Sequence, residues 1–249
     1  MTPPMKIIGS FVSPYVRKVL ACMNLKGLHY EVDPITPFFG NQEFERVSPL
    51  RRIPVLIDGD LDISDSSVIC AYLDEAYGGY PLLPSSPKDR ARARWFEEYA
   101  DTRLGDVFIW GLFYQKVVRP AVWGETPDAD RVAQILREAL PRELDYLEKE
   151  VPISGFLFGG IGLADISIAT FFRNGAYAGF EPDSKRWPRV AAYVEHVLAN
   201  DCIASLLPYE NIQRSSEIRR RRQALLDAGA PLTGETLGLT EPRRGIMPL

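Results

Sequence analysis

The chain has 249 residues, of which 46% are hydrophobic and 25% are charged, so it can bury one large core or two modest ones. Its formal net charge is -4, which gives no general attraction to nucleic acid or to an acidic membrane, and we expect neither as a partner. The three cysteines form no C-x-x-C pair, which argues against a disulfide framework, and two histidines are too few for a His-rich metal site. No apolar run reaches about 18 residues, which argues against a membrane span. We therefore expect a cytoplasmic protein.

The first eighty residues alternate between strand and helix patterns. Short apolar runs predict strands, Ser13 before Pro14 predicts the N-cap and first turn of a helix, and Asp58-Gly59-Asp60 predicts a tight hairpin. The predicted strands lie at residues 6–10, 29–33, 53–57 and 61–63, and the predicted helices at residues 13–27 and 64–79, with one helical turn near 42–46. A strand, helix and strand in this order form a βαβ unit.

A proline-rich linker at residues 80–87 separates this half from a helical remainder. Helices are predicted from residue 88 to about 115, from about 128 to 150 with a kink at Pro141, at 163–177 and at 187–198. From about residue 211 the sequence becomes polar and rich in proline and glycine. We therefore expect domains at 1–80 and 88–210 and a polar tail at 211–249, in which the arginine run at 219–222 forms a solvated helix face.

A serine stands where the first strand passes into the first helix. The start of a helix carries unpaired N–H groups and the positive end of its dipole, so Ser13 lies where an anion such as a thiolate is stabilised. Lowering a thiol pKa by one to two pH units needs about 1.4–2.8 kcal/mol, which one charge-assisted hydrogen bond and the dipole can supply. Ser13 could thus activate a bound thiol, and ordinary N-capping is the alternative.

Two further motifs follow the same logic. Pro54 removes a hydrogen-bond donor from the third strand. A cis Ile53–Pro54 bond would leave the Ile53 backbone free to pair with a peptide-like ligand. The alternative is an edge strand with a trans proline. Asp65 and Ser66 open the next helix, where N–H groups and a hydroxyl can hold a carboxylate and Asp65 can accept from an ammonium group. Ordinary capping is again the alternative.

In this order and spacing the three motifs resemble the glutathione-binding half of cytosolic glutathione transferases. The segment from Ser13 to Lys18 is similar to that of the serine-type classes, closest to tau-like and bacterial relatives, and the catalytic serine of the family falls on Ser13. Omega-type relatives have a cysteine there, so thiol transfer through an enzyme cysteine is disfavoured. The resemblance covers residues 5–80 strongly and continues more loosely to about 210. It implies an α/β thioredoxin-like N-terminal domain followed by an all-α helical-bundle C-terminal domain.

The resemblance also implies the roles of the binding residues. Ile53, before the family's cis-proline Pro54, would pair with the cysteinyl backbone of glutathione, and Arg52 would face the glycine carboxylate. Asp65 and Ser66 would hold the γ-glutamyl end, although the family usually has a longer Glu in place of Asp65.

Family likeness places a hydrophobic pocket for the second substrate between the Ser13 loop and the first long helices of the second domain. Its candidate walls, each with core packing as the alternative, are Phe11, Val12, Trp110, Phe113 and Tyr114. In the helical domain, Gly162 to Ile166 resembles the family's capping box, in which Asp165 bonds back to the cap.

The resemblance implies a homodimeric glutathione S-transferase that acts in detoxification. It would use glutathione as co-substrate, direct the glutathione thiolate at a small hydrophobic electrophile, and need no metal. A glutathione-dependent isomerase or peroxidase would use the same site. The alternative from another class is a non-catalytic binding protein similar to the stringent starvation proteins. Such proteins tend to lose the pocket residues, and because Ser13, Pro54 and Ser66 are retained we favour the enzyme.

Overall fold

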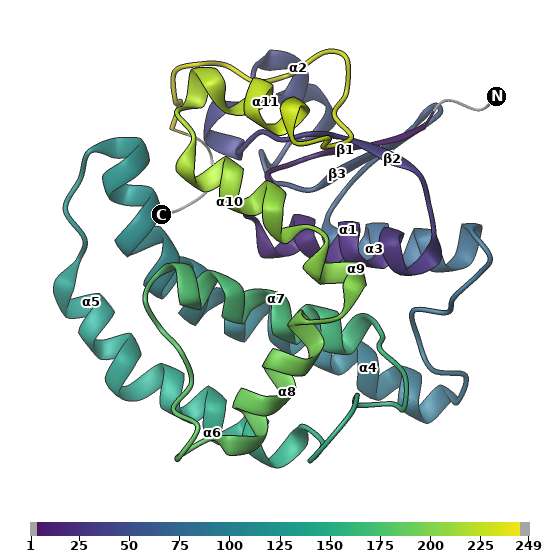
Figure 1. The fold of residues 1–249 in the computed structure, drawn as a ribbon, viewed down its shortest axis with the longest axis vertical. Helices are drawn as coiled ribbons and strands as arrows, with labels where there is room; N and C mark the ends of the chain where they lie inside the picture. Colours follow the sequence, from purple (N-terminus) through teal and green to yellow (C-terminus); the bar gives the residue numbers. More distant parts are fainter. Residues whose placement is uncertain (1–3, 245–249) are drawn as a thin grey trace. The chain divides into compact units, whose positions relative to one another are not determined.

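The computed structural model describes residues 4–244, which fall into two compact units. One unit joins residues 4–81 to residues 201–244, and the other comprises residues 82–200. The course of the chain can be followed in Figure 1. This division differs from the expected one, because the chain from residue 201 onward belongs to the first unit and does not form a separate polar tail.

The first unit is built on a four-stranded sheet of order β2-β1-β3-β4. Its strands are β1 (Met5–Ile8), β2 (Tyr30–Asp33), β3 (Val55–Asp58) and β4 (Leu61–Ser64). Strands β1 and β2 are parallel, and β3 is antiparallel to both of its neighbours. The predicted βαβ unit is confirmed, and so is the hairpin after β3, where Gly59 adopts the positive φ of 64° that its tight turn requires.

The helices of the first unit begin and end largely where capping residues predict. They are α1 (Pro14–Lys26), η1 (Pro37–Phe39), α2 (Gln42–Val47) and α3 (Ser66–Ala76), followed near the C-terminus by α9 (Asp201–Ala204), α10 (Leu207–Ser215) and α11 (Ile218–Asp227). The predicted apolar face of α1, which includes Val16, Val19 and Leu20, is fully buried, and Gly27 ends the helix in the left-handed conformation.

An extended segment after α11, residues 230–243, covers the outer edge of β2 and is called here the C-terminal strap. The N–H of Val32 donates to the Pro231 carbonyl at 2.7 Å, and the N–H of Thr233 donates to the Val32 carbonyl at 3.1 Å. The strap thereby satisfies backbone groups that an open sheet edge would leave unpaired. The arginine run is only partly solvated, because Arg222 donates to the Thr233 carbonyl and lies 3.5 Å from the Asp33 carboxylate.

The second unit is helical. Its elements are α4 (Pro87–Tyr99), η2 (Ala100–Trp123), α5 (Ala129–Gln134), η3 (Ile135–Ala139), α6 (Leu140–Glu150), α7 (Leu163–Tyr177) and α8 (Pro188–Leu198). The buried helix α7 packs against α4, η2 and α8 and is the predicted central helix. The helix predicted to end near residue 115 continues through Pro120, because the π-helical η2 ends only before Gly124. Pro141 lies just after the π-helical stretch η3, in a segment that stays helical from residue 129 to residue 150.

The predicted cap of α7 is formed. One carboxylate oxygen of Asp165 accepts from the Gly162 N–H at 3.0 Å, and the other accepts from the Leu157 N–H at 2.9 Å and the Tyr193 hydroxyl at 2.7 Å. Burial nevertheless raises the pKa of Asp165 above its ordinary value, because these bonds only partly offset the loss of water.

The three cysteines, Cys22, Cys70 and Cys202, are buried and unbridged. Across residues 4–244 no group of three or more His, Cys, Asp or Glu side chains could hold a metal ion. In the same span no single helix is long and apolar enough to cross a membrane; a bent pair, Pro188–Leu198 with Asp201–Ser215, reaches that length and composition only when its two helices are taken together.

Candidate active site

The register of the sheet brings the three sequence motifs to one end of it. Ile8 of β1 pairs with Val55 of β3, and Val55 pairs with Ser64 of β4. One step further along each strand, the chain leaves β1 toward the Ser13 loop, enters β3 from Ile53–Pro54, and leaves β4 into Asp65. The loop, the proline and the acidic turn are therefore neighbours across adjacent strands.

Gly9 shows how closely two of these segments approach. A Cβ atom on Gly9, whose φ is 154°, would lie 3.2 Å from the Cβ of Ile53 and only 2.4 Å from a methyl group of Val16. A side chain at this position would force the segments apart. Glycine thus lets the chain that leads to Ser13 lie directly against Ile53.

Ser13 is the N-cap of α1, so the simpler of its two interpretations is confirmed. Its backbone is extended, and its hydroxyl oxygen accepts from the Val16 N–H at 3.4 Å, which is long for such a bond. The side chain is half-buried. Within the described chain the Ser13 hydroxyl has no acceptor for its own proton. It can therefore cap the helix and still donate to an anion at the helix start.

The Ile53–Pro54 bond is cis, as the resemblance implies. The backbone N–H and carbonyl of Ile53 form no hydrogen bond within residues 4–244, although the residues on either side are held in place. Ser48 fixes Arg52 by accepting from its N–H at 3.0 Å and donating to its carbonyl at 2.8 Å. The side chain of Arg52 is exposed, whereas its neighbour Arg51 is buried and lies 3.2 Å from the Glu45 carboxylate.

Asp65 caps α3 from a backbone conformation that is rare for a residue with a side chain, with φ at 98°. One of its carboxylate oxygens accepts from the N–H groups of Ser67 at 2.9 Å and Val68 at 3.2 Å. The carboxylate is exposed, and its other oxygen remains open to a ligand. Ser66 is buried, and its hydroxyl has no partner among the residues that the structure describes. Lys18, which the sequence did not single out, supports this turn by donating to the Ser67 hydroxyl at 3.1 Å.

The predicted pocket walls fall into two groups. In the first unit, Val12 is half-buried, but Phe11 is 1% exposed and its ring lies 5.3 Å from that of Tyr209, which makes it a packing residue in this structure. In the second unit, η2 carries Trp110, Phe113 and Tyr114. The first two are half-buried, whereas Tyr114 is buried, with its ring 5.9 Å from that of Trp110.

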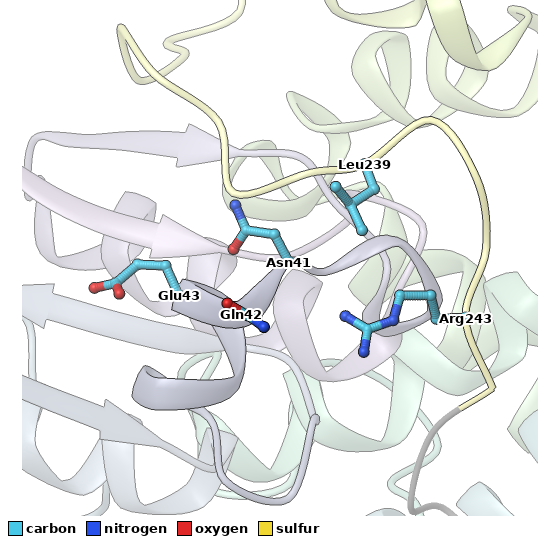
Figure 2. Close-up of a pocket in the computed structure, with 5 residues that line it drawn as sticks. All are labelled: Asn41, Gln42, Glu43, Leu239 and Arg243. Carbon is cyan, nitrogen blue, oxygen red and sulfur yellow. The ribbon is translucent and has the colours of Figure 1, made fainter.

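A separate hollow of about 530 Å³ lies between the start of α2 and the C-terminal strap. Figure 2 shows its lining residues, which are Asn41, Gln42, Glu43, Leu239 and Arg243. The predicted site residues do not line it. Its charged groups already have partners, since Glu43 pairs with Arg46 at 2.7 Å and Arg243 with Glu45 at 3.4 Å. The hollow therefore offers no converging groups for catalysis.

Comparisons with known proteins agree with the fold and the motifs. Residues 7–81 match the family model for the N-terminal domain of glutathione S-transferases. A glutathione transferase of Zea mays, GST 23, is 32% identical over 229 residues, which cover 88% of this chain and 96% of the relative. The crystal structure of a glutathione S-transferase from Rhodospirillum rubrum F11 is similar with a TM-score of 0.75 and 26% identity, covering 82% of this chain and 91% of that one.

A tau-class glutathione S-transferase from mango, Mangifera indica, is similar as well, with a TM-score of 0.66 and 25% identity. The match covers 85% of this chain and 96% of that one. These matches extend over both units and confirm the predicted fold class, a thioredoxin-like domain followed by a helical domain.

Proposed function

The chain belongs to the glutathione transferase family, and on that premise we propose that it binds glutathione at the end of the sheet where the Ser13 loop, Ile53–Pro54 and Asp65-Ser66 meet. Ser13 donates a hydrogen bond to the glutathione sulfur and favours its thiolate. The thiolate then attacks an apolar electrophile. The observation that carries this proposal is the half-buried Ser13 hydroxyl, which has a proton to donate at the start of α1.

The chemistry follows from charge. A thiolate is favoured over its thiol by the Ser13 hydrogen bond and by the N-terminal end of the α1 dipole. A decrease of one to two pH units in the thiol pKa corresponds to roughly 1.4–2.8 kcal/mol. The thiol proton passes to solvent, the sulfur electron pair forms a bond to the electrophilic carbon, and that carbon releases its leaving group or shifts its π electrons. Ser13 keeps its own proton throughout.

Three contacts position the tripeptide. The unpaired N–H and carbonyl of Ile53 pair with the cysteinyl backbone in the manner of an added strand. The exposed guanidinium of Arg52 attracts the glycine carboxylate. At the other end, Ser66 and the start of α3 hold the γ-glutamyl carboxylate, and the open oxygen of Asp65 accepts from its ammonium group.

For the electrophile, Val12 is the candidate contact beside Ser13, because it keeps part of its apolar surface exposed. Trp110 and Phe113 of η2 are also half-buried and are kept as candidates by family likeness. Tyr114, which is buried, supports Trp110 by packing, and the buried Phe11 packs on Tyr209. We expect the protein to be cytoplasmic and to form a homodimer. Light scattering of the purified chain would measure its oligomeric state. Assays for glutathione-dependent isomerisation and peroxide reduction test the related activities of the same site.

The experiment compares Ser13→Ala with Ser86→Ala on glutathione resin and in conjugation assays. Ser86 is a matched control, because it also precedes a proline and caps its helix by accepting an N–H bond at 3.4 Å. We expect both variants to bind the resin, and Ser13→Ala alone to lose about ten- to hundredfold in kcat, the loss of thiolate that a rise of one to two pH units causes.

Conjugation by Ser13→Ala near the wild-type rate would show that Ser13 does not activate the thiol, and Ser10 and Tyr15 would be tested next. If the wild-type protein does not bind the resin, the non-catalytic alternative replaces the enzyme.

A further inference from the structure

Helix α10 holds the loop that carries Ser13. The side-chain amide of Gln213 accepts from the Phe11 N–H at 2.8 Å and donates to the Pro34 carbonyl at 2.5 Å. Gln213 is 2% exposed, so water cannot replace these bonds. A single side chain near the C-terminus thereby joins the loop after β1 to the end of β2.

A buried ion pair holds the same loop from its other side. The guanidinium of Arg17 bonds both carboxylate oxygens of Glu210, at 3.0 and 2.6 Å, and neither side chain is exposed. Arg17 also donates to the Val12 carbonyl at 3.3 Å. Glu210 therefore fixes an arginine that in turn fixes the residue directly before Ser13.

These contacts come from one face of α10. Gln213 lies three and four residues after Glu210 and Tyr209, so it neighbours both on the helix surface, and the ring of Tyr209 packs on Phe11. Within the loop itself, the Ser10 carbonyl accepts from the Ser13 N–H at 3.0 Å, which closes a turn but does not fix the turn relative to the sheet. That connection comes from Gln213 of α10, which bonds the Phe11 backbone, and from Arg17 of α1, which Glu210 holds and which bonds the Val12 carbonyl.

We propose that Gln213 is a positioning residue for Ser13, which it places by holding the Phe11 backbone. This inference rests on the proposed function, because it assigns a distant residue to the activation of the bound thiol. Catalytic groups must be held to within a fraction of an ångström, and a misplacement of about 1 Å can cost on the order of a hundredfold in rate. One residue of the C-terminal segment, far from the motifs in sequence, then positions the hydroxyl that activates the thiol.

The test is a double-mutant cycle of Gln213→Met and Ser13→Ala. Methionine has a similar volume to glutamine but forms neither of its two bonds. For each variant, kcat, the Kd for glutathione, the thermal midpoint and the pKa of the bound thiol, followed by thiolate absorbance, are measured. Gln115→Met is the matched control, since Gln115 is also buried and accepts from Arg119 and from the Asp128 N–H but lies in the other unit.

We expect Gln213→Met to lower kcat about tenfold and to raise the pKa of the bound thiol by about one pH unit. The Kd for glutathione should change less than about threefold. In the Ser13→Ala background the same substitution should change kcat less than about twofold, because the residue acts through Ser13. Gln115→Met should lower the thermal midpoint and leave the thiol pKa at its wild-type value. If Gln213→Met does not fold, Gln213→Leu, which also lacks both bonds, takes its place with the same directions of change.

A wild-type kcat and thiol pKa in the folded Gln213→Met variant, or losses that multiply in the double variant, would overturn the inference. A Ser13→Ala protein whose bound thiol titrates like that of the wild type would instead overturn the role of Ser13 itself. The two failures are therefore distinguishable.

Discussion

The Asp33 carboxylate, at the end of β2, binds the backbone of Leu237, which lies 204 residues further along the chain. Its Oδ2 atom accepts from the Leu237 N–H at 2.6 Å, and its Oδ1 atom accepts from the Thr236 hydroxyl at 2.7 Å. Burial raises the pKa of Asp33, while these two bonds and the nearby Arg222 partly restore its acidity. One buried side chain thus fastens the C-terminal strap to the sheet.

Replacing this carboxylate should release the strap without unfolding the sheet. We expect Asp33→Ala to accelerate amide hydrogen exchange at Leu237 and Leu239, because the first loses its acceptor and the second lies on the detached segment. Exchange at Tyr77, at the end of α3, should not change. Unaltered protection of Leu237 in the variant would show that Asp33 is not the fastening point.

Gly9 should not tolerate a side chain. We expect Gly9→Ala to destabilise the protein by about 1–3 kcal/mol, because the added methyl would overlap Val16 and strain the positive φ. Glutathione affinity should fall as well, since Ile53 would be displaced. Gly78→Ala is the control, because a Cβ at Gly78 meets no atom within 4 Å. Equal thermal midpoints for the two variants would contradict the close packing of Gly9.

Glu143 should stabilise the helical unit at neutral pH and not in acid. Burial alone would raise the pKa of Glu143, but hydrogen bonds from Arg103, Tyr99 and Arg142 outweigh it, so the pKa lies below its ordinary 4.5. A depressed carboxyl pKa adds stability above the unfolded pKa, and this stability is lost as the pH falls through the folded pKa. Glu143→Gln should therefore unfold more readily at pH 7, with a difference that shrinks below about pH 4.5. Denaturant melts of both proteins across this range measure it, and a difference independent of pH would refute it.

Arg52 should contribute to binding and not to the chemical step. We expect Arg52→Ala to raise the KM for glutathione about three- to tenfold with kcat little changed, because an exposed charge pair with the glycine carboxylate is the same in the ground and transition states. Arg219→Ala, at another exposed arginine, is the control. A fall in kcat at saturating glutathione would assign Arg52 a different role.

Local rules predicted most of the first unit. Ser13, Gly27 and Gly59 mark element ends by capping and turn chemistry, which act over a few residues, and the structure has them where the sequence indicated. The apolar face of α1 follows from helical spacing in the same way. Register then needs two pairings, Ile8 with Val55 and Val55 with Ser64, to bring the three motifs together.

Long-range pairing could not be predicted in this way. Periodicity predicted the helix that carries Arg17, but no helix was predicted at Glu210, and nothing in the sequence indicates that these two charges, 193 positions apart, are buried against each other. The strap was expected to be part of a polar tail because of its composition. Its backbone pairs with β2, a property that side-chain composition does not reveal. Phe11 was assigned to a pocket by its place beside Ser13, but Tyr209 packs on it.

The most direct test of the account is a crystal structure of the protein soaked with glutathione. We expect the sulfur within hydrogen-bonding distance of the Ser13 hydroxyl, with the cysteinyl backbone paired to Ile53 and the γ-glutamyl end at Asp65 and Ser66. Glutathione bound with its sulfur directed away from Ser13, or absent from this end of the sheet at saturating concentration, would contradict the proposed activation.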